Sequence, residues 1–304
     1  MTAKKSTRLR RSQLAVPGVS EKMLAKAAAS QADHVFCDLE DAVAPKSKVG
    51  ARDTICNALN ELDWGKSVRC VRVNDIGTQW CHEDIIHIVE KAGHNLDTIM
   101  LPKPLCASDV LFADTLLSQL EQKLDLPHKI GLEVLIEEVQ AMQNVQEIAT
   151  SCERLECMIF GMGDYSASQG LVVEDIGKAS GYPGDIFHYP RYQMTIAARA
   201  AGIDAIDGPF VDFKDEANYA EECRRALTLG MVGKWAIHPA QIAPALAIFS
   251  PSQEQVDFAR EIIAVYREAE AQGIGSVGHK GVMVDAASAR LFQNTADRAD
   301  IIGL

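Results

Sequence analysis

Short apolar segments recur along this chain at intervals that leave room for one helix between neighbours, and this pattern restricts the fold more than any other feature. The segments are SQLAVPG (12–18), HVFCDLE (34–40), SVRCVRVN (67–74), DTIMLPK (97–103), IGLEVLIE (130–137), CMIFGMGD (157–164), IDAIDGPF (203–210) and GKWAIHP (233–239). The stretches between them carry Ala, Leu, Glu and Lys at helical spacing, and several end in Gly. Eight strand–helix repeats predict a closed (β/α)8 barrel, the TIM barrel, rather than an open sheet.

Two further helical stretches, 251–273 and 284–302, follow the eighth segment and are separated by the Gly-rich turn 273–281. These helices are additional to the eight strand–helix units that make up a barrel. We therefore expect residues 1–250 to form the barrel and residues 251–304 to form a C-terminal helical extension. The extension can pack on its own barrel or cap the mouth of a neighbouring subunit, and the sequence leaves both open.

Composition excludes several classes of protein. The 304 residues are 47% apolar with a net charge of -12, and such an acidic chain lacks the basic face that nucleic-acid binding needs. The eight cysteines are scattered without any C-x-x-C pair, which indicates reduced thiols. No apolar run is long enough to span a bilayer, and the basic N-terminus is not followed by a signal-peptide core. We expect a cytoplasmic protein without a membrane partner.

Polar residues follow nearly every predicted strand. They are Asp38, Glu40, Asp41, Arg72, Asn74, Lys103, Glu137, Asp164, Asp207 and His238. In a parallel barrel the carboxyl ends of the strands meet at one mouth, where the chemistry of such folds lies. Several carboxylates together with Arg and Lys predict a site for a divalent metal and an anionic substrate.

Glu137 and Asp164 are the candidate metal ligands. Each ends an apolar, β-branched run, and two carboxylates that leave other positions open suit Mg²⁺, which completes its shell with water and substrate oxygens. The alternative is that both are ordinary acids at helix starts. Glu133 lies on the same strand face as Glu137 but deeper, which favours a satisfied carboxylate inside the barrel.

Arg72 lies between apolar neighbours in VRVN, where a guanidinium needs a carboxylate or an oxyanion as partner. An ion pair with Glu40 or Asp41 and a role at a developing oxyanion are compatible, because a supporting acid can aim the arginine. Lys103 is equally well explained as a lysine with a buried stem. His238 is better explained by a helix start than by catalysis, and GMGD (161–164) completes no phosphate-binding fingerprint.

Several motifs together resemble those of a known family. They are VPG (16–18), DLEDAVAPKSK (38–48), VRVN (71–74), LPK (101–103), EVLIE (133–137), GMGDYSAS (161–168), IDGPF (206–210) and GKWAIHP (233–239). Over nearly its whole length the chain is similar to the citrate lyase β-subunit and malyl-CoA lyase family, within the HpcH/HpaI aldolase superfamily. DGPF and GKWAIHP resemble the malyl-CoA and β-methylmalyl-CoA lyases more than the stand-alone citrate lyase subunits.

The resemblance implies roles for particular residues. Glu137 and Asp164 match two carboxylates that hold Mg²⁺ (or Mn²⁺), and Arg72 matches an arginine that steadies the oxyanion. Glu40 and Asp41 remain the acids expected to aim it, on the argument from charge given above. Asp285 matches an aspartate on a lid that closes over a neighbouring subunit's site and moves a proton on the enolate carbon. For the phosphates of coenzyme A, Arg11 and Lys46 are the candidates; Arg11 by itself suggests an anion site, with a solvated basic tail as the alternative.

The resemblance also implies an activity. It is reversible cleavage of an acyl-CoA such as L-malyl-CoA or β-methylmalyl-CoA to acetyl-CoA or propionyl-CoA and glyoxylate, in a homotrimer or homohexamer. The stretch 169–192 is shorter than expected for malyl-CoA lyases, which leaves the oxoacid open. The alternatives are a citramalyl-CoA lyase that forms pyruvate, a malyl-CoA thioesterase, and a non-catalytic subunit that binds CoA ligands.

Overall fold

Eight parallel strands form a closed barrel in this computed structural model, which describes residues 8–172 and 184–304. The strands are β1 (Ser12–Pro17), β2 (His34–Asp38), β3 (Val68–Arg72), β4 (Thr98–Leu101), β5 (Gly131–Ile136), β6 (Leu155–Phe160), β7 (Asp204–Asp207) and β8 (Gly233–Ala236). β8 closes the barrel on β1, with Ser12 opposite Lys234. The prediction of a (β/α)8 barrel is therefore confirmed.

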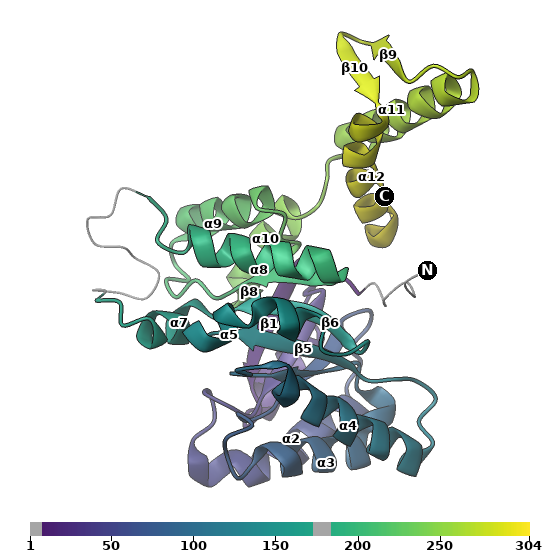
Figure 1. Ribbon diagram of the computed structural model, residues 1–304. Coiled ribbons are helices and arrows are strands. Elements are labelled where there is room, and N and C mark those ends of the chain that lie inside the picture. Colours follow the sequence, from purple (N-terminus) through teal and green to yellow (C-terminus); the bar gives the residue numbers. More distant parts are fainter. Residues whose placement is uncertain (1–7, 173–183) are drawn as a thin grey trace.

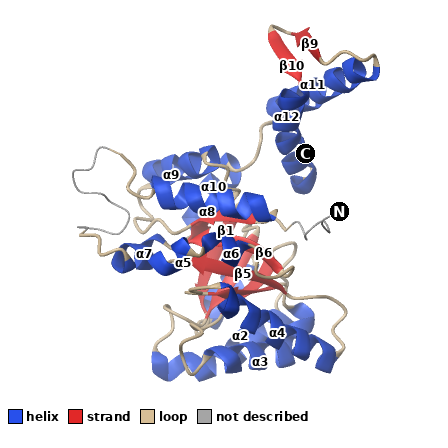
Figure 2. Ribbon diagram, viewed as in Figure 1, coloured by secondary structure: helices blue, strands red, loops and turns tan. Residues whose placement is uncertain are grey.

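Helices surround the barrel, as Figure 1 and Figure 2 show. They are α1 (Glu21–Ala28), α2 (Lys48–Glu61), α3 (Cys81–Ala92), α4 (Ala107–Leu124), α5 (Val139–Gln143), α6 (Val145–Ala149), α7 (Met162–Ser168), α8 (His188–Ala201), α9 (Glu216–Thr228) and α10 (Ile242–Ile248). Short 3-10 turns cover Pro45–Ser47, Gly93–Asn95 and Pro239–Gln241. Residues 173–183, inside the stretch that is shorter than expected, lie outside the described residues.

The core has two parts because both faces of a parallel barrel are covered. One lies between the sheet and the helices and includes Leu24, Ile55 and Ile85. The other fills the barrel itself, with Phe36 packed against Trp235 at a ring-centroid distance of 4.4 Å. All six residues of β5 and of β6 are buried, and apart from Glu133 and Glu156 they are apolar or glycine, so neither strand shows a regular apolar–polar alternation.

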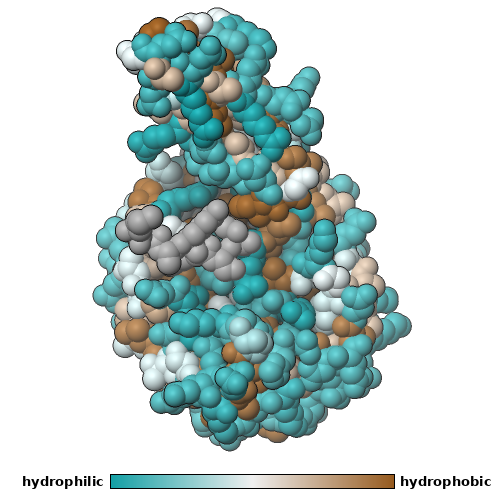
Figure 3. Space-filling view, turned by 90° about the vertical axis from the view of Figure 1, so that its right-hand side faces the viewer, coloured by the Kyte–Doolittle hydropathy of each residue, from teal (hydrophilic) through white to brown (hydrophobic). Residues whose placement is uncertain are grey.

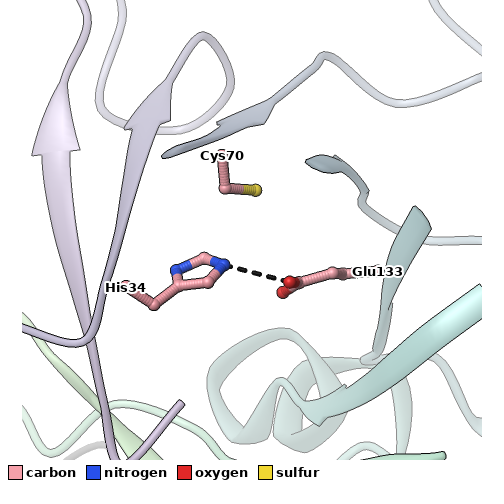
Figure 4. Close-up of side chains that lie close together, drawn as sticks. All are labelled: His34, Cys70 and Glu133. Carbon is pink, nitrogen blue, oxygen red and sulfur yellow. Dashed lines mark hydrogen bonds and ion pairs between the residues drawn. The ribbon is translucent and has the colours of Figure 1, made fainter. Parts of the chain in front are cut away.

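A polar layer lies below this apolar filling, at the amino end of the barrel. Glu133 accepts hydrogen bonds from Arg10 Nε (3.0 Å), Gln13 Nε2 (3.0 Å) and His34 Nε2 (3.0 Å). His34, Cys70 and Glu133 point toward one another (Figure 4) and form a group that could hold a metal ion. However, the buried guanidinium of Arg10 already neutralises Glu133 and would repel a second cation. Glu133 is thus a satisfied interior carboxylate, as expected.

The chain continues after α10 as α11 (Gln253–Ala271), the antiparallel strands β9 (Ser276–His279) and β10 (Val282–Asp285), and α12 (Ala286–Ile302). α11 packs along α12, and Phe258 meets Phe292 edge to face at 5.3 Å. This C-terminal extension stands off the barrel on the side of the N-terminus (Figure 1). None of the helices in the described part of the chain is long and apolar enough to cross a membrane. The division near residue 250 stays a prediction.

Candidate active site at the barrel mouth

Five segments bring charged side chains to the carboxyl ends of adjacent strands. Arg72 is the last residue of β3, Glu137 directly follows β5, and Asp164 lies in the first turn of α7, just beyond β6. Glu40 and Lys103 occupy the loops after β2 and β4. These are the sites that the parallel arrangement predicts for chemistry, and the structure brings these residues together as the sequence indicated.

Arg72 is held from several sides. Its Nε and Nη2 donate to Asp38 Oδ1 (2.7 Å) and Oδ2 (2.6 Å), a bidentate pair. Its Nη1 lies 3.0 Å from Glu40 Oε2 and 3.7 Å from Asp41 Oδ2. The guanidinium lies over the rings of Phe36 and Trp235, at 5.8 and 5.5 Å from their centroids. The apolar floor and the acids therefore fix the plane of Arg72.

Electrostatics keeps Arg72 charged. Burial alone would lower the pKa of this guanidinium, but the charge and hydrogen bonds of Asp38, together with the charges of Glu40 and Glu137, outweigh burial and raise it well above its usual range. Burial would likewise raise the pKa of Asp38, but Arg72 and the backbone N–H groups of Glu40 and Ala42 outweigh burial and lower it. Asp38, rather than Glu40 or Asp41, is thus the main partner of Arg72, and the other two acids add to it.

Lys103 connects the acids of the mouth. Its Nζ lies 2.5 Å from Glu40 Oε1 and 3.2 Å from Asp164 Oδ2, while its backbone N–H donates to Glu137 Oε1 at 3.1 Å. Its φ of 51° lies in the left-handed region that side chains rarely adopt. A strained residue whose side chain and main chain both face the carboxylates belongs to the site.

Glu137 is the most buried acid of the mouth after Asp38, with 3% of its surface exposed. A Cβ added at Gly161 would lie 2.6 Å from Glu137 Oε2, so the glycine lets the chain pass close beside this carboxylate. Burial, followed by the charges of Glu40 and Asp164, raises the pKa of Glu137 to about 8 despite Lys103 and Arg72. An ionised Glu137 therefore needs more positive charge than the described residues supply.

The carboxylates at the barrel mouth are suited to bind a divalent cation. Five carboxylates, those of Asp38, Glu40, Asp41, Glu137 and Asp164, share two cations, Arg72 and Lys103. Asp38 and Glu40 are occupied by Arg72. Within the described part of the chain, by contrast, Glu137 accepts only a backbone N–H and Asp164 pairs only with Lys103. Carboxylate oxygens suit Mg²⁺, so Glu137 and Asp164 are the pair able to hold it.

Lys48 supports the mouth from the first turn of α2. Its buried Nζ donates to the carbonyl oxygens of Leu39 (2.9 Å) and Glu40 (2.8 Å) and lies 5.4 Å from the centroid of Trp80. Burial lowers the pKa of Lys48, and the nearby carboxylates of Glu40 and Asp38 partly offset this. The lysine thus ties down the loop that carries Glu40.

If the mouth is a catalytic site, replacing Lys48 with Met is expected to lower its turnover about tenfold, since small displacements of aligned groups are costly in rate. The loss should fall on kcat more than on KM, because Lys48 Nζ is bound to the carbonyl oxygens of Leu39 and Glu40 and acts on the mouth only by positioning Glu40. Steady-state kinetics with Lys66→Met as the control, an exposed lysine before β3, checks this. Equal kinetics of Lys48→Met and wild type would contradict the role.

Other candidates lie elsewhere. Arg11 precedes β1 at the amino end of the barrel, opposite the mouth, where Nε and Nη2 donate to Asp33 at 2.7 Å each. Within its own chain Arg11 is thus far from Glu137, and its assignment to an anion such as the phosphates of coenzyme A stays a prediction. Lys46 is exposed in the 3-10 turn after β2, on the side of the mouth. Asp285 caps α12 on the extension, and the hydrogen bonds of its carboxylate in the described chain go to Ser288, not to its own mouth.

Two other strand-end residues have structural partners. Asp207 is fully buried between Lys234 (2.5 Å) and Arg191 (2.8 Å). His238 caps the 3-10 turn at Pro239, its Nδ1 accepting from Ala240 N at 3.2 Å, and stacks on Phe213. This confirms the helix-start explanation for His238.

The sequence analysis missed Lys48, although its place in DLEDAVAPKSK was a signal. It also did not single out Asp38 as the partner of Arg72.

Comparison with known proteins finds relatives that match nearly the whole chain. The chain is 40% identical over 302 residues to an L-malyl-CoA/β-methylmalyl-CoA lyase of Cereibacter sphaeroides, covering 96% of this chain and 95% of that protein. It is 33% identical to a malyl-CoA/β-methylmalyl-CoA/citramalyl-CoA lyase of Chloroflexus aurantiacus (90% and 82% covered) and to a (3S)-malyl-CoA thioesterase of C. sphaeroides (96% and 95%).

Among solved structures, the fold is similar to that of CitE from Mycobacterium tuberculosis in complex with magnesium, acetoacetate and coenzyme A. The TM-score is 0.74 with 27% identity, over 95% of this chain and 97% of that one. The sequence model described as HpcH/HpaI aldolase/citrate lyase matches residues 11–239, which include all eight strands and every mouth residue described above. The chain thus belongs to the HpcH/HpaI aldolase/citrate lyase family.

Proposed function

We propose that this protein is a Mg²⁺-dependent carbon–carbon lyase. Its reaction is the reversible cleavage of a 3-hydroxyacyl-CoA, such as L-malyl-CoA or β-methylmalyl-CoA, to acetyl-CoA or propionyl-CoA and glyoxylate. The observation that carries the proposal is the mouth itself, where a rigidly held Arg72 lies among Glu40, Lys103, Glu137 and Asp164. The lyases of C. sphaeroides, 40% identical over almost the whole chain, support the substrate class.

Glu137 and Asp164 would hold the metal ion. When bound, Mg²⁺ supplies a Lewis acid and a template for the oxygens of the oxoacid. The protein keeps these two carboxylates close together and leaves them few other hydrogen-bond partners. The N–H group of Lys103 holds Glu137 in place, and Gly161 leaves room beside its carboxylate. The magnesium complex of the M. tuberculosis protein supports this assignment.

Arg72 would stabilise the negative charge that develops on the reacting oxygens. In the cleavage direction the 3-hydroxyl group loses its proton, the bond between carbons 2 and 3 breaks, and the oxoacid leaves with a new carbonyl group at carbon 3. The thioester enolate that remains receives a proton on carbon 2, which balances the proton lost by the hydroxyl group. Asp38 and Glu40 hold the guanidinium of Arg72 in place, so little reorganisation is needed as charge develops. Asp41, 3.7 Å from Arg72 and exposed, would assist at the rim.

Asp285 would move the proton on the enolate carbon from the extension of a neighbouring subunit. In its own chain its carboxylate accepts from Ser288 N (2.8 Å) and Ser288 Oγ (2.9 Å), which lowers its pKa. Its strand β10 stands away from the barrel (Figure 1). A homotrimer or homohexamer would bring it to a mouth. Arg11 and Lys46 stay our candidates for the phosphates of coenzyme A, and of the two Lys46 is exposed beside the mouth of its own chain. We expect the protein to work in the cytoplasm.

Cleavage of malyl-CoA with and without EDTA tests the proposal. We expect release of glyoxylate and acetyl-CoA that stops with chelator and returns with Mg²⁺. Activity indifferent to EDTA would contradict it. Failure to bind Mg²⁺ with an oxoacid in calorimetry would instead favour a non-catalytic subunit that binds CoA ligands.

The products separate two close alternatives. Similarity to the (3S)-malyl-CoA thioesterase keeps hydrolysis as a second candidate, for which malate and free CoA would be the products. Similarity to the C. aurantiacus protein keeps citramalyl-CoA, whose cleavage would give pyruvate. Mass analysis of the products from both substrates distinguishes the three reactions in one experiment.

A further inference from the structure

A cavity of about 540 Å³ lies between the amino end of the barrel and the C-terminal extension, at the opposite end from Glu137. The barrel lines it with Arg199, Leu227 and Phe249, and the extension lines it with Phe292 and Arg298. Figure 3 shows apolar atoms gathered below the extension on this face. None of the charged residues of the mouth lines this cavity.

The cavity is lined by several arginine side chains, which ordinary packing between a helix and a barrel does not require. Arg8, Arg10 and Arg11 also line it, but each is paired with carboxylates: Arg8 with Asp97 and Glu156, Arg10 with Glu133, Glu156 and Asp204, and Arg11 with Asp33. Arg199 and Arg298 have no salt bridge to any carboxylate in the described chain. Two carboxylates, Asp204 and Asp297, also line the cavity, but neither forms a salt bridge with Arg199 or Arg298. Among the described residues, these two arginines are therefore the cations of the cavity without an ion-pair partner.

Both of these guanidiniums converge on one turn. Arg199 Nη2 donates to the carbonyl oxygen of Gly230 (3.1 Å) from α8, and Arg298 Nη2 donates to the carbonyl oxygen of Met231 (3.4 Å) from α12. Burial, followed by the charge of Arg199, lowers the pKa of Arg298, and Asp204 offsets this only in part. Two neighbouring cations that repel each other in a partly desolvated cavity favour an anion between them.

The walls provide an apolar surface beside this pair. Phe258 and Phe292 pack edge to face on the extension, and Phe249 closes the barrel side. Cavities of this volume that combine apolar walls with a few polar groups are typical of small-molecule sites. We propose that this cavity binds a small organic anion, whose phosphate or carboxylate group pairs with Arg199 and Arg298 while an aromatic or aliphatic part lies against the phenylalanines.

Such a ligand would connect α8 of the barrel to α12 of the extension. The extension also carries Asp285, so a bound anion would restrict how far Asp285 can move toward a neighbour's mouth. This consequence rests on the proposed function. The binding itself does not, and it can be measured on a protein with no lyase activity.

Calorimetry on the full-length protein with phenyl phosphate, benzoate and inorganic phosphate tests the site. We expect phenyl phosphate to bind more tightly than inorganic phosphate, because only the former fills the apolar part. Benzoate compared with phenyl phosphate tells whether the site prefers a carboxylate or a phosphate. Arg199→Gln and Arg298→Gln should each weaken binding about tenfold, the usual cost of one charge-assisted hydrogen bond.

The matched control is Arg224→Gln, which removes an exposed arginine of α9 outside the cavity and should leave binding unchanged. No saturable binding of phenyl phosphate, or equal binding by wild type and both cavity variants, would overturn the site. Because Arg199 is exposed and Arg298 is half-buried, either variant alone is expected to fold. Loss of lyase activity without loss of phenyl phosphate binding would count against the proposed function only.

Discussion

Replacing Glu137 with Gln is expected to lower kcat/KM for malyl-CoA cleavage about a thousandfold or more and to remove its dependence on Mg²⁺. The amide keeps the shape of the carboxyl group but cannot balance a divalent cation, and a catalytic metal contributes several kcal/mol of charge stabilisation. Steady-state kinetics across a Mg²⁺ titration measures both effects. A variant that keeps wild-type activity would show that Glu137 is not a metal ligand.

The same substitution should leave the fold intact. Burial and neighbouring acids raise the pKa of Glu137 to about 8, above that of an unfolded glutamate. Without metal, the free energy of unfolding of the wild type therefore falls as the pH rises between the ordinary glutamate value and about 8, since the folded state must ionise a buried acid. Gln removes this loss, so at mildly alkaline pH the metal-free variant should melt no lower than the wild type.

Mg²⁺ should reverse the order of the two melting temperatures. A ligand that binds only the folded state raises the free energy of unfolding, so added Mg²⁺ should raise the Tm of the wild type and not that of Glu137→Gln. Glu138→Gln is the matched control, because it changes the adjacent, half-buried acid, whose side chain makes no hydrogen bond or ion pair with the described residues of the mouth. That control should keep both the activity and the Mg²⁺ response of the wild type.

Many residues of the mouth could be predicted from the sequence, because the regular alternation of strand and helix segments indicates parallel strands whose carboxyl ends lie together. Glu137 and Asp164 each end an apolar run, and parallel strands place such ends at one edge. The same rule places Arg11 at the other end of the barrel. It precedes its strand, and a residue in that position lies at the amino end, where it pairs with Asp33.

The supporting contacts could not be predicted, since they depend on loop paths. Lys48 reaches back from α2 to carbonyl oxygens eight and nine residues earlier, and Lys103 adopts a positive φ that directs its N–H to Glu137. Neither path has a periodic signature. The cavity pair Arg199 and Arg298 joins elements almost a hundred residues apart, and only the packing of α12 near the barrel shows it.

Replacing Asp285 with Asn is expected to lower kcat by about 10²- to 10⁴-fold, the range of a positioned acid or base, with little effect on Mg²⁺ affinity. The change is conservative for the fold because Asn is as good a helix N-cap as Asp, so the amide oxygen of the new side chain would still accept from Ser288 N. Kinetics together with the Mg²⁺-dependent Tm separates this variant from Glu137→Gln, which should lose both responses.

Mixing the two inactive variants tests whether Asp285 serves a neighbouring subunit. A hybrid oligomer can combine the intact Glu137 of an Asp285→Asn subunit with the intact Asp285 of a Glu137→Gln subunit. After co-refolding in equal amounts, about one quarter of the sites should be of this kind, so about one quarter of wild-type activity should return. Asp285 acts within its own chain if no activity returns while mixed oligomers form, because each chain of the hybrid then still lacks one of the two groups.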